Sequence, residues 1–196
     1  ILFGPNFLSL NEKLRVACIG VGGKGRGEVR AMAGELLVAF CDPDDEQAAE
    51  TYKEFPEIPR YKDFRIMLEE RCDEIDAVTI STPDHVHGVA AMMALRMGKH
   101  VFCQKPLTRT IYEARTLTEA ARKYGVATQM GNQGHASEHT RRIKEWIHAG
   151  CIGKVREVHF YTNRPIWPQG ELSRPKEHLP VPETLDWHTW LGPAQK

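Results

Sequence analysis

A glycine-rich turn between an apolar run and a helical segment constrains this fold more than any other feature. The run covers residues 14–19, and glycines follow at 20, 22 and 25 in the spacing G-x-G-x-x-G. Such glycines allow a tight turn, let the backbone approach a pyrophosphate, and let helix and strand pack closely, while the helix N-terminus attracts the phosphates. The stretch therefore predicts a dinucleotide-binding turn. The predicted cofactor-binding residues here are Gly20, Gly22, Gly23, Lys24, Gly25 and Arg26.

The next apolar run, residues 36–41, reads as a central parallel strand, and Asp42 follows it directly. A carboxylate at this place accepts hydrogen bonds from the adenosine ribose and repels a 2′-phosphate, so we predict NAD rather than NADP. Lys24 and Arg26 favour the alternative, because cations would attract that phosphate.

Strands alternate with helices along most of the chain. Further apolar runs cover 75–80, 100–103 and 126–130, and helical segments separate them. This alternation predicts an α/β fold, a doubly wound parallel sheet of the Rossmann type, over residues 14–134, after an N-terminal lead of residues 1–13.

The unusual polar turns of the chain all follow predicted strands. In a parallel sheet the carboxyl ends of the strands meet at one edge, where ligands bind. We therefore expect one shared site at that edge. Beyond the glycine turn and Asp42, its predicted cofactor-binding residues are Ser81, Thr82, Pro83, His85, His87, Gln104, Lys105 and Asn132.

Lys105 is the candidate catalytic residue. It lies after a strand and before a proline, which can hold its amine at the mouth of the cleft. An amine there can exchange a proton with a substrate hydroxyl as hydride leaves the same carbon. A solvated lysine at a strand end explains the position equally well.

Two histidines and the tryptophans have open alternatives. His85 and His87 offer too few ligands for a metal site, so we predict none and expect them to line the cofactor cleft, with Asp84 capping the next helix. Either contact with a carboxamide or sugar, or a simple turn, explains the polar residues after the last strand, namely Asn132, Gln133 and His135. Three tryptophans either stack on a sugar or nicotinamide ring or belong to the core of a second domain: Trp167, Trp187 and Trp190.

The pattern changes after Ser137. A helix carries Ile143, Trp146 and Ile147 on one side, residues 155–161 alternate like a half-exposed strand, and the remainder is rich in Pro and Trp. Residues 135–196 therefore read as the beginning of a second domain, truncated in this chain.

Composition excludes several classes of protein. The 26 basic and 26 acidic residues balance, which argues against partners such as nucleic acid or an anionic membrane. Five cysteines without a C-x-x-C pair indicate neither a disulfide framework nor a zinc ribbon, and we expect Cys18, Cys41 and Cys103 to be small buried hydrophobes. No apolar run is long enough to span a bilayer.

From Leu14 to about Tyr161 the chain resembles the amino-terminal portion of the Gfo/Idh/MocA oxidoreductase family. The matching motifs are the glycine turn, T-P-x-x-x-H at residues 82–87, Q-K-P at 104–106 where the family has E-K-P, and G-x-I-G-x-V at 150–155. The resemblance implies a Rossmann domain followed by an open antiparallel sheet (α+β), a nicotinamide cofactor, a sugar or polyol substrate, and Lys105 as the proton-transfer residue. It further implies a homo-oligomer at full length and a cytoplasmic or periplasmic location, the latter with an export signal removed upstream.

Two departures from the family pattern matter. Gln104 stands where the family usually has Glu, so this position supplies no negative charge beside Lys105. The family's D-x-x-x-H pair is absent after Tyr161, so we expect a fragment that binds cofactor at best, or else a binding domain alone.

Three functions follow as hypotheses. The first is an NAD(P)-dependent oxidoreductase that transfers hydride between a sugar or polyol hydroxyl carbon and nicotinamide. The second is a glycosidase or lyase that uses tightly bound NAD transiently. The third is a dinucleotide-binding module without chemistry of its own.

Overall fold

The computed structural model describes residues 13–163 and 179–194, which form two compact units. The first unit comprises residues 13–131 together with 182–194, and the second holds the described residues between them. The first unit thus runs without a break to Gly131 and also includes the C-terminal segment from residue 182. The domain boundary after residue 134 stays a prediction. Most of the predicted N-terminal lead, and Trp167, lie outside the described residues.

A six-stranded sheet forms the centre of the first unit. Its spatial order is β3-β2-β1-β4-β5-β6, and every neighbouring pair is parallel. This confirms the doubly wound α/β fold. The strands are β1 (Arg15–Ile19), β2 (Leu36–Cys41), β3 (Arg60–Tyr61), β4 (Ala77–Ile80), β5 (His100–Gln104) and β6 (Thr128–Gly131).

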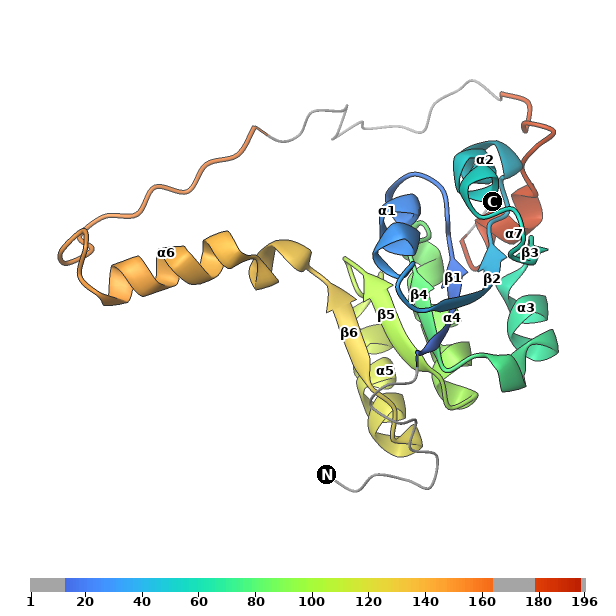
Figure 1. Ribbon diagram of the computed structural model, residues 1–196, viewed down its shortest axis with the longest axis horizontal. Helices are drawn as coiled ribbons and strands as arrows, with labels where there is room; N and C mark the ends of the chain where they lie inside the picture. Colours follow the sequence, from blue (N-terminus) through green and yellow to red (C-terminus); the bar gives the residue numbers. More distant parts are fainter. Residues whose placement is uncertain (1–12, 164–178, 195–196) are drawn as a thin grey trace. The chain divides into compact units, whose positions relative to one another are not determined.

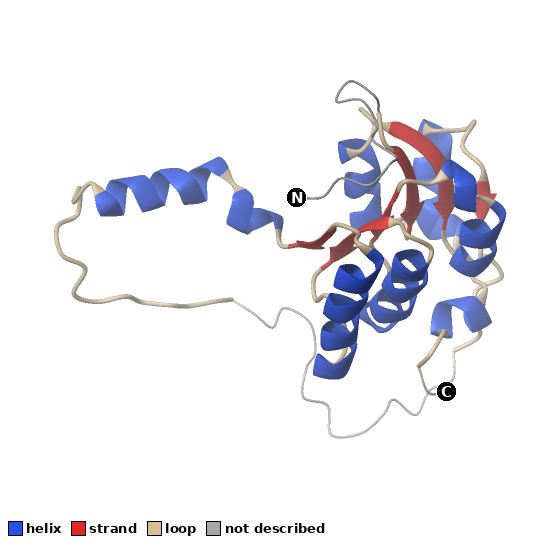
Figure 2. Ribbon diagram, turned by 90° about the horizontal axis from the view of Figure 1, so that it is seen from below, coloured by secondary structure: helices blue, strands red, loops and turns tan. Residues whose placement is uncertain are grey.

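Helices cover both faces of this sheet (Figures 1 and 2). In the first unit they are α1 (Lys24–Ala31), α2 (Asp45–Glu54), α3 (Phe64–Glu70), η1 (Cys72–Glu74), α4 (Asp84–Arg96), α5 (Ile111–Tyr124) and α7 (Trp187–Leu191). The second unit holds η2 (Gln133–Ala136) and α6 (Glu138–His148).

The core lies in two layers because successive strand residues point to opposite faces of the sheet. Val16, Cys18 and Phe40 pack against α1 and α2 on one face. Ala17 and Ile19 point to the other face, where the larger cluster includes Leu68, Leu95 and Leu117 of α3, α4 and α5. The near-continuous apolar strands of the sequence follow from this double coverage.

Local sequence signals account for several helix ends. The Asp63 side chain accepts the Arg65 backbone N–H at the start of α3. A complete Thr110–Glu113 capping box opens α5, and Gly125 ends it with φ +66°. The prediction that Asp84 caps α4 is wrong. Pro83 is the N-cap, Asp84 is the first helical residue, and no side chain caps that end.

The second unit differs from expectation. Residues 155–161 are exposed irregular chain and form no strand. Alternating polarity alone does not make a strand, since the backbone groups also need a neighbouring strand to bond. On α6 the large apolar side chains are exposed, among them Trp146 at 57%.

Three cysteines behave as buried hydrophobes, as the sequence predicts. Cys18, Cys41 and Cys103 are at most 2% exposed. Desolvation raises the pKa of the Cys18 thiol to about 11 and that of Cys103 to about 12. None of the described helices has the length and apolar character needed to cross a membrane.

Candidate functional site

The glycine turn is held tightly between β1 and its two neighbouring strands. Gly20 has φ +78°, and its N–H donates to the Cys41 carbonyl at 2.7 Å. A Cβ on Gly20 would lie 2.7 Å from the backbone of Ser81. A side chain is therefore excluded here by backbone conformation and by the turn after β4.

The other three glycines of the turn have different surroundings. A Cβ on Gly25 would lie 1.9 Å from the Gly20 carbonyl oxygen, which confirms its role in close helix–strand packing. A Cβ on Gly22 would lie 2.7 Å from the Gln47 carbonyl oxygen, so this glycine is required by α2. Gly23, with φ +49° and nothing within 4 Å of such a Cβ, is the residue that opens onto free space at the start of α1.

Asp42 fixes the turn through both of its carboxylate oxygens. Oδ2 accepts the N–H groups of Val21 (2.9 Å) and Gly22 (3.1 Å), and Oδ1 accepts that of Asp44 (3.0 Å). The residue is 7% exposed, and desolvation raises its pKa against the lowering effect of these bonds. The carboxylate thus holds the glycine turn in shape, a role that the sequence argument, which considered only ribose, did not predict.

A cavity of about 200 Å³ lies in front of the glycine turn. Its walls come from the turns after β1, β2 and β4, from α2 and from the C-terminal helix α7. The lining residues are Gly20, Gly22, Gly23, Asp42, Pro43, Asp44, Gln47, Ser81, Thr82, Pro83 and Trp190. Three of the predicted turns, those after β1, β2 and β4, line this cavity. The lining also includes four residues outside the predicted cofactor-binding set: Pro43, Asp44, Gln47 and Trp190. Another cavity, of about 230 Å³ between α3, α4 and α7, has none of these polar turns in its wall.

The two predicted histidines take structural positions. His87 is 1% exposed inside α4, with Nδ1 2.6 Å from the Pro106 carbonyl oxygen and Nε2 2.9 Å from that of Thr82. His87 therefore ties the turn after β4 to the turn after β5 instead of lining the cavity. His85 Nε2 lies 2.9 Å from the Trp190 carbonyl oxygen.

Gln104 takes part in a buried polar chain. Its Nε2 donates to Glu28 Oε1 at 2.8 Å, and Lys24 Nζ lies 2.9 Å from the same oxygen. Gln104 and Glu28 are 4% and 7% exposed. Lys24, with 63% of its side chain exposed, stays at the entrance of the turn.

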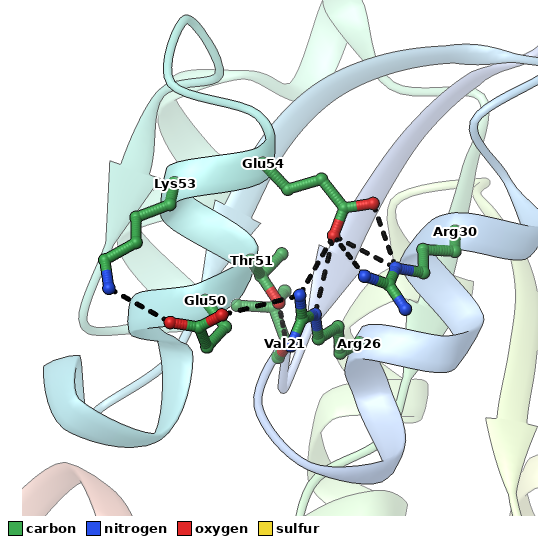
Figure 3. A network of polar contacts seen from close by, with 7 residues as sticks. All are labelled: Val21, Arg26, Arg30, Glu50, Thr51, Lys53 and Glu54. Carbon is green, nitrogen blue, oxygen red and sulfur yellow. Dashed lines mark hydrogen bonds and ion pairs between the residues drawn. The ribbon is translucent and has the colours of Figure 1, made fainter.

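Arg26 points away from the predicted phosphate position. Its guanidinium faces α2, 3.4 Å from Glu54 and 3.6 Å from Glu50, and Arg30 shares Glu54 (Figure 3). The Thr51 hydroxyl donates to the Val21 carbonyl at 2.6 Å in the same region. Arg26 therefore helps to dock α1 on α2 and is not among the residues that line the cavity.

Lys105 lies at the end of β5, is exposed, and joins Pro106 through a cis peptide bond. Its backbone N–H donates to the Gln104 side chain at 3.2 Å. Asn132 begins the second unit, where its carbonyl accepts the His135 N–H. Within the described ranges, no three His, Cys, Asp or Glu side chains are grouped to hold a metal ion.

The turn fits a dinucleotide. Gly23 faces open space, and α1 begins directly after it with no acidic residue in its first turn. A helix N-terminus without acids attracts phosphate through its free N–H groups and dipole.

Comparison with known proteins agrees with this geometry. Residues 14–132 match the model of the GFO_IDH_MocA family, described as an oxidoreductase family with an NAD-binding Rossmann fold. The chain belongs to this family. The matched range covers every strand of the parallel sheet and the turns at its carboxyl edge.

Relatives in this family include inositol dehydrogenases. The chain is 31% identical to scyllo-inositol 2-dehydrogenase (NAD(+)) from Bacillus subtilis over 83% of this chain and 48% of the relative. It is 27% identical to inositol 2-dehydrogenase 4 from Saccharopolyspora erythraea, over 92% and 54%. The crystal structure of myo-inositol 2-dehydrogenase from Lactobacillus plantarum superposes with a TM-score of 0.66 at 28% identity, over 74% of this chain and 43% of that one. The chain thus spans about half the length of the relatives it matches.

Proposed function

We propose that the protein is an NAD-dependent dehydrogenase that oxidises a hydroxyl carbon of a sugar or polyol. The observation that supports this most is the meeting of the glycine turn, Asp42 and the turn after β4 around one cavity in an NAD-binding family fold. The names of the inositol dehydrogenases among its relatives support the substrate class. The proposal concerns the protein at the length of its relatives.

In this proposal Lys105 transfers the proton. NAD, when bound, accepts a hydride from the hydroxyl carbon of the substrate. The Lys105 amine takes the hydroxyl proton, so that the carbon leaves as a carbonyl. Its place at the end of β5, held through the Gln104 side chain and next to Pro106, supports this role. His87 supports this position of Lys105, because its ring contacts both the Pro106 carbonyl and the Thr82 carbonyl in the turn after β4.

Asp42 supports NAD over NADP. It is an acid at the end of β2, and its carboxylate already accepts three backbone N–H groups. An added 2′-phosphate beside this carboxylate would meet charge repulsion. Of the two cations that favoured NADP in the sequence, Arg26 is paired with Glu54 and Lys24 with Glu28.

The experiment uses protein of the relatives' length, with its cofactor released and identified, and screens sugars, polyols and glycosides. We expect net reduction of added NAD with a cyclic polyol or sugar. Lys105→Met should lower kcat by about 10²- to 10⁴-fold and leave the NAD Kd within about threefold. Bond cleavage without net NAD reduction would instead identify a glycosidase or lyase. Tight NAD binding with no turnover on any substrate would identify a binding module.

A further inference from the structure

The C-terminal helix α7 is docked on the turn that follows β2, although the second unit separates the two in sequence. Asp44 and Leu185 form an antiparallel bridge. The Asp186 N–H donates to the Pro43 carbonyl at 2.8 Å, and the Asp45 N–H donates to the Thr184 carbonyl at 3.2 Å. These backbone bonds hold residues 184–186 beside the turn that follows β2.

A second set of contacts joins α7 to the start of α4. The Trp190 carbonyl lies 2.9 Å from His85 Nε2, and the Trp190 and His85 rings meet edge to face at 5.4 Å. Trp187 also stacks on Trp190, with ring centroids 5.1 Å apart and 16° between the planes. The Trp190 ring is therefore in contact with two aromatic rings, those of His85 and Trp187.

Trp190 lines the cavity in front of the glycine turn and is only partly buried. The wall around it is contributed by Asp42, Pro43 and Asp44 after β2 and by residues 81–83 after β4. Neither Gln104 nor Lys105 is part of this wall. The cavity thus lies at the end of β2, where the adenosine ribose of a dinucleotide belongs, and not at the end of β5, where the proposed chemistry takes place.

We propose that Trp190 forms a wall of the adenosine subsite, with its indole ring packed against the adenine and ribose of NAD. An indole is flat, rigid and apolar, and every base has a π-face that stacks on such a ring. The cavity, at about 200 Å³, suits part of a dinucleotide rather than the whole molecule. This subsite rests on NAD as the cofactor and adds a residue outside the matched family range of 14–132.

The test measures binding of NAD, ADP-ribose and nicotinamide mononucleotide by titration calorimetry. ADP-ribose lacks only the nicotinamide and keeps the adenosine, the pyrophosphate and the second ribose, whereas the mononucleotide carries the nicotinamide, its ribose and one phosphate but no adenosine. The variants are Trp190→Leu, which keeps an apolar side chain but no ring face, and Trp190→Phe, which keeps a ring. Trp146→Leu, on α6 of the second unit, is the matched control. Amide hydrogen exchange at Asp186 reports whether α7 stays docked.

We expect Trp190→Leu to weaken NAD and ADP-ribose by the same factor, about 5- to 100-fold, with the mononucleotide unchanged. Trp190→Phe should bind both within about threefold of wild type, and Trp146→Leu should match wild type. Wild-type affinity of Trp190→Leu for ADP-ribose would overturn the subsite and leave the cofactor site standing. Weakened mononucleotide binding with unchanged ADP-ribose binding would overturn it too, as would equal losses in Leu and Phe accompanied by lost protection at Asp186. A wild-type chain that binds none of the three ligands would overturn the cofactor site as well.

Discussion

The Gln104 side-chain amide donates to Glu28 Oε1 across 2.8 Å, between the end of β5 and the middle of α1. Both side chains are almost fully buried. An amide at position 104 can donate to this carboxylate, whereas a second carboxylate would face it with like charge. Gln104, which stands where the family usually has Glu, therefore complements the buried Glu28. The carboxylate beside this motif comes from Glu28 of α1 rather than from position 104.

Gln104→Glu should destabilise the protein by about 1–3 kcal/mol, because it places two buried carboxylates within hydrogen-bonding distance. Adding Glu28→Gln should recover most of that loss by exchanging donor and acceptor. A double-mutant cycle from urea unfolding measures the coupling. Additive single effects would show that the two side chains act independently.

Gly25→Ala should prevent correct folding of the glycine turn, because its Cβ would lie 1.9 Å from the Gly20 carbonyl oxygen. Gly27→Ala is the matched control in the same helix, since a Cβ there meets nothing within 4 Å. It should stabilise the protein by about 0.5–1 kcal/mol through helix propensity. Thermal unfolding distinguishes the two variants, and equal tolerance of both would contradict the packing described for the turn.

His87→Phe should cost about 1–3 kcal/mol, because it leaves the buried carbonyls of Thr82 and Pro106 without their ring partner. At the relatives' length it should also lower kcat more than it raises the NAD Kd, since Pro106 adjoins Lys105. His139→Phe, at an exposed position of α6, is the control. Unchanged stability and turnover in His87→Phe would remove its positioning role.

Acid should weaken the ion pair between Arg15 of β1 and Asp76, the residue before β4. Arg15 bonds the Asp76 carboxylate and holds its pKa below the ordinary value. A lowered folded-state pKa stabilises the protein above about pH 4, the usual range of the unfolded group, and that contribution is lost as pH falls through the folded-state pKa.

Asp76→Asn should therefore cost about 1 kcal/mol at pH 7, and the difference from wild type should shrink below about pH 4. Urea unfolding at several pH values measures it, with the exposed Glu119→Gln as control. A difference that stays constant down to pH 3 would mean that ionisation of Asp76 is not what stabilises the fold.

Local and periodic features of the sequence were enough to predict most of the first unit. Buried strands follow from apolar runs, and helix ends follow from Asp63, the Thr110 capping box and Gly125, because caps are short-range interactions. The two-residue strand β3 was missed, since so short an edge strand carries no periodic signal. For residues 155–161 a strand was predicted from alternating polarity, but none forms because no strand in the described part of the chain pairs with them.

The site was predictable in location but not in the contacts that each side chain makes. Parallel topology brings the turns to one edge, whichever way their side chains point. Whether Arg26 meets phosphate or Glu54, and whether His87 lines a cleft or joins two turns, depends on the packing of helices distant in sequence. Glu28 offered one signal, its i,i+4 spacing from Lys24, but nothing local relates it to Gln104.

The docking of α7 also has a consequence for the order in which this unit is completed during synthesis. Pro43 and Asp186 are joined by a hydrogen bond, yet the ribosome makes more than a hundred residues between them. The parallel sheet can form from residues already made, but the cavity receives its last lining side chain only when Trp190 emerges. Closing so long a loop costs little more free energy than closing one of half the length, so the delay is one of time rather than of stability. A nascent chain can thus have its sheet in place well before the wall of its cavity is complete.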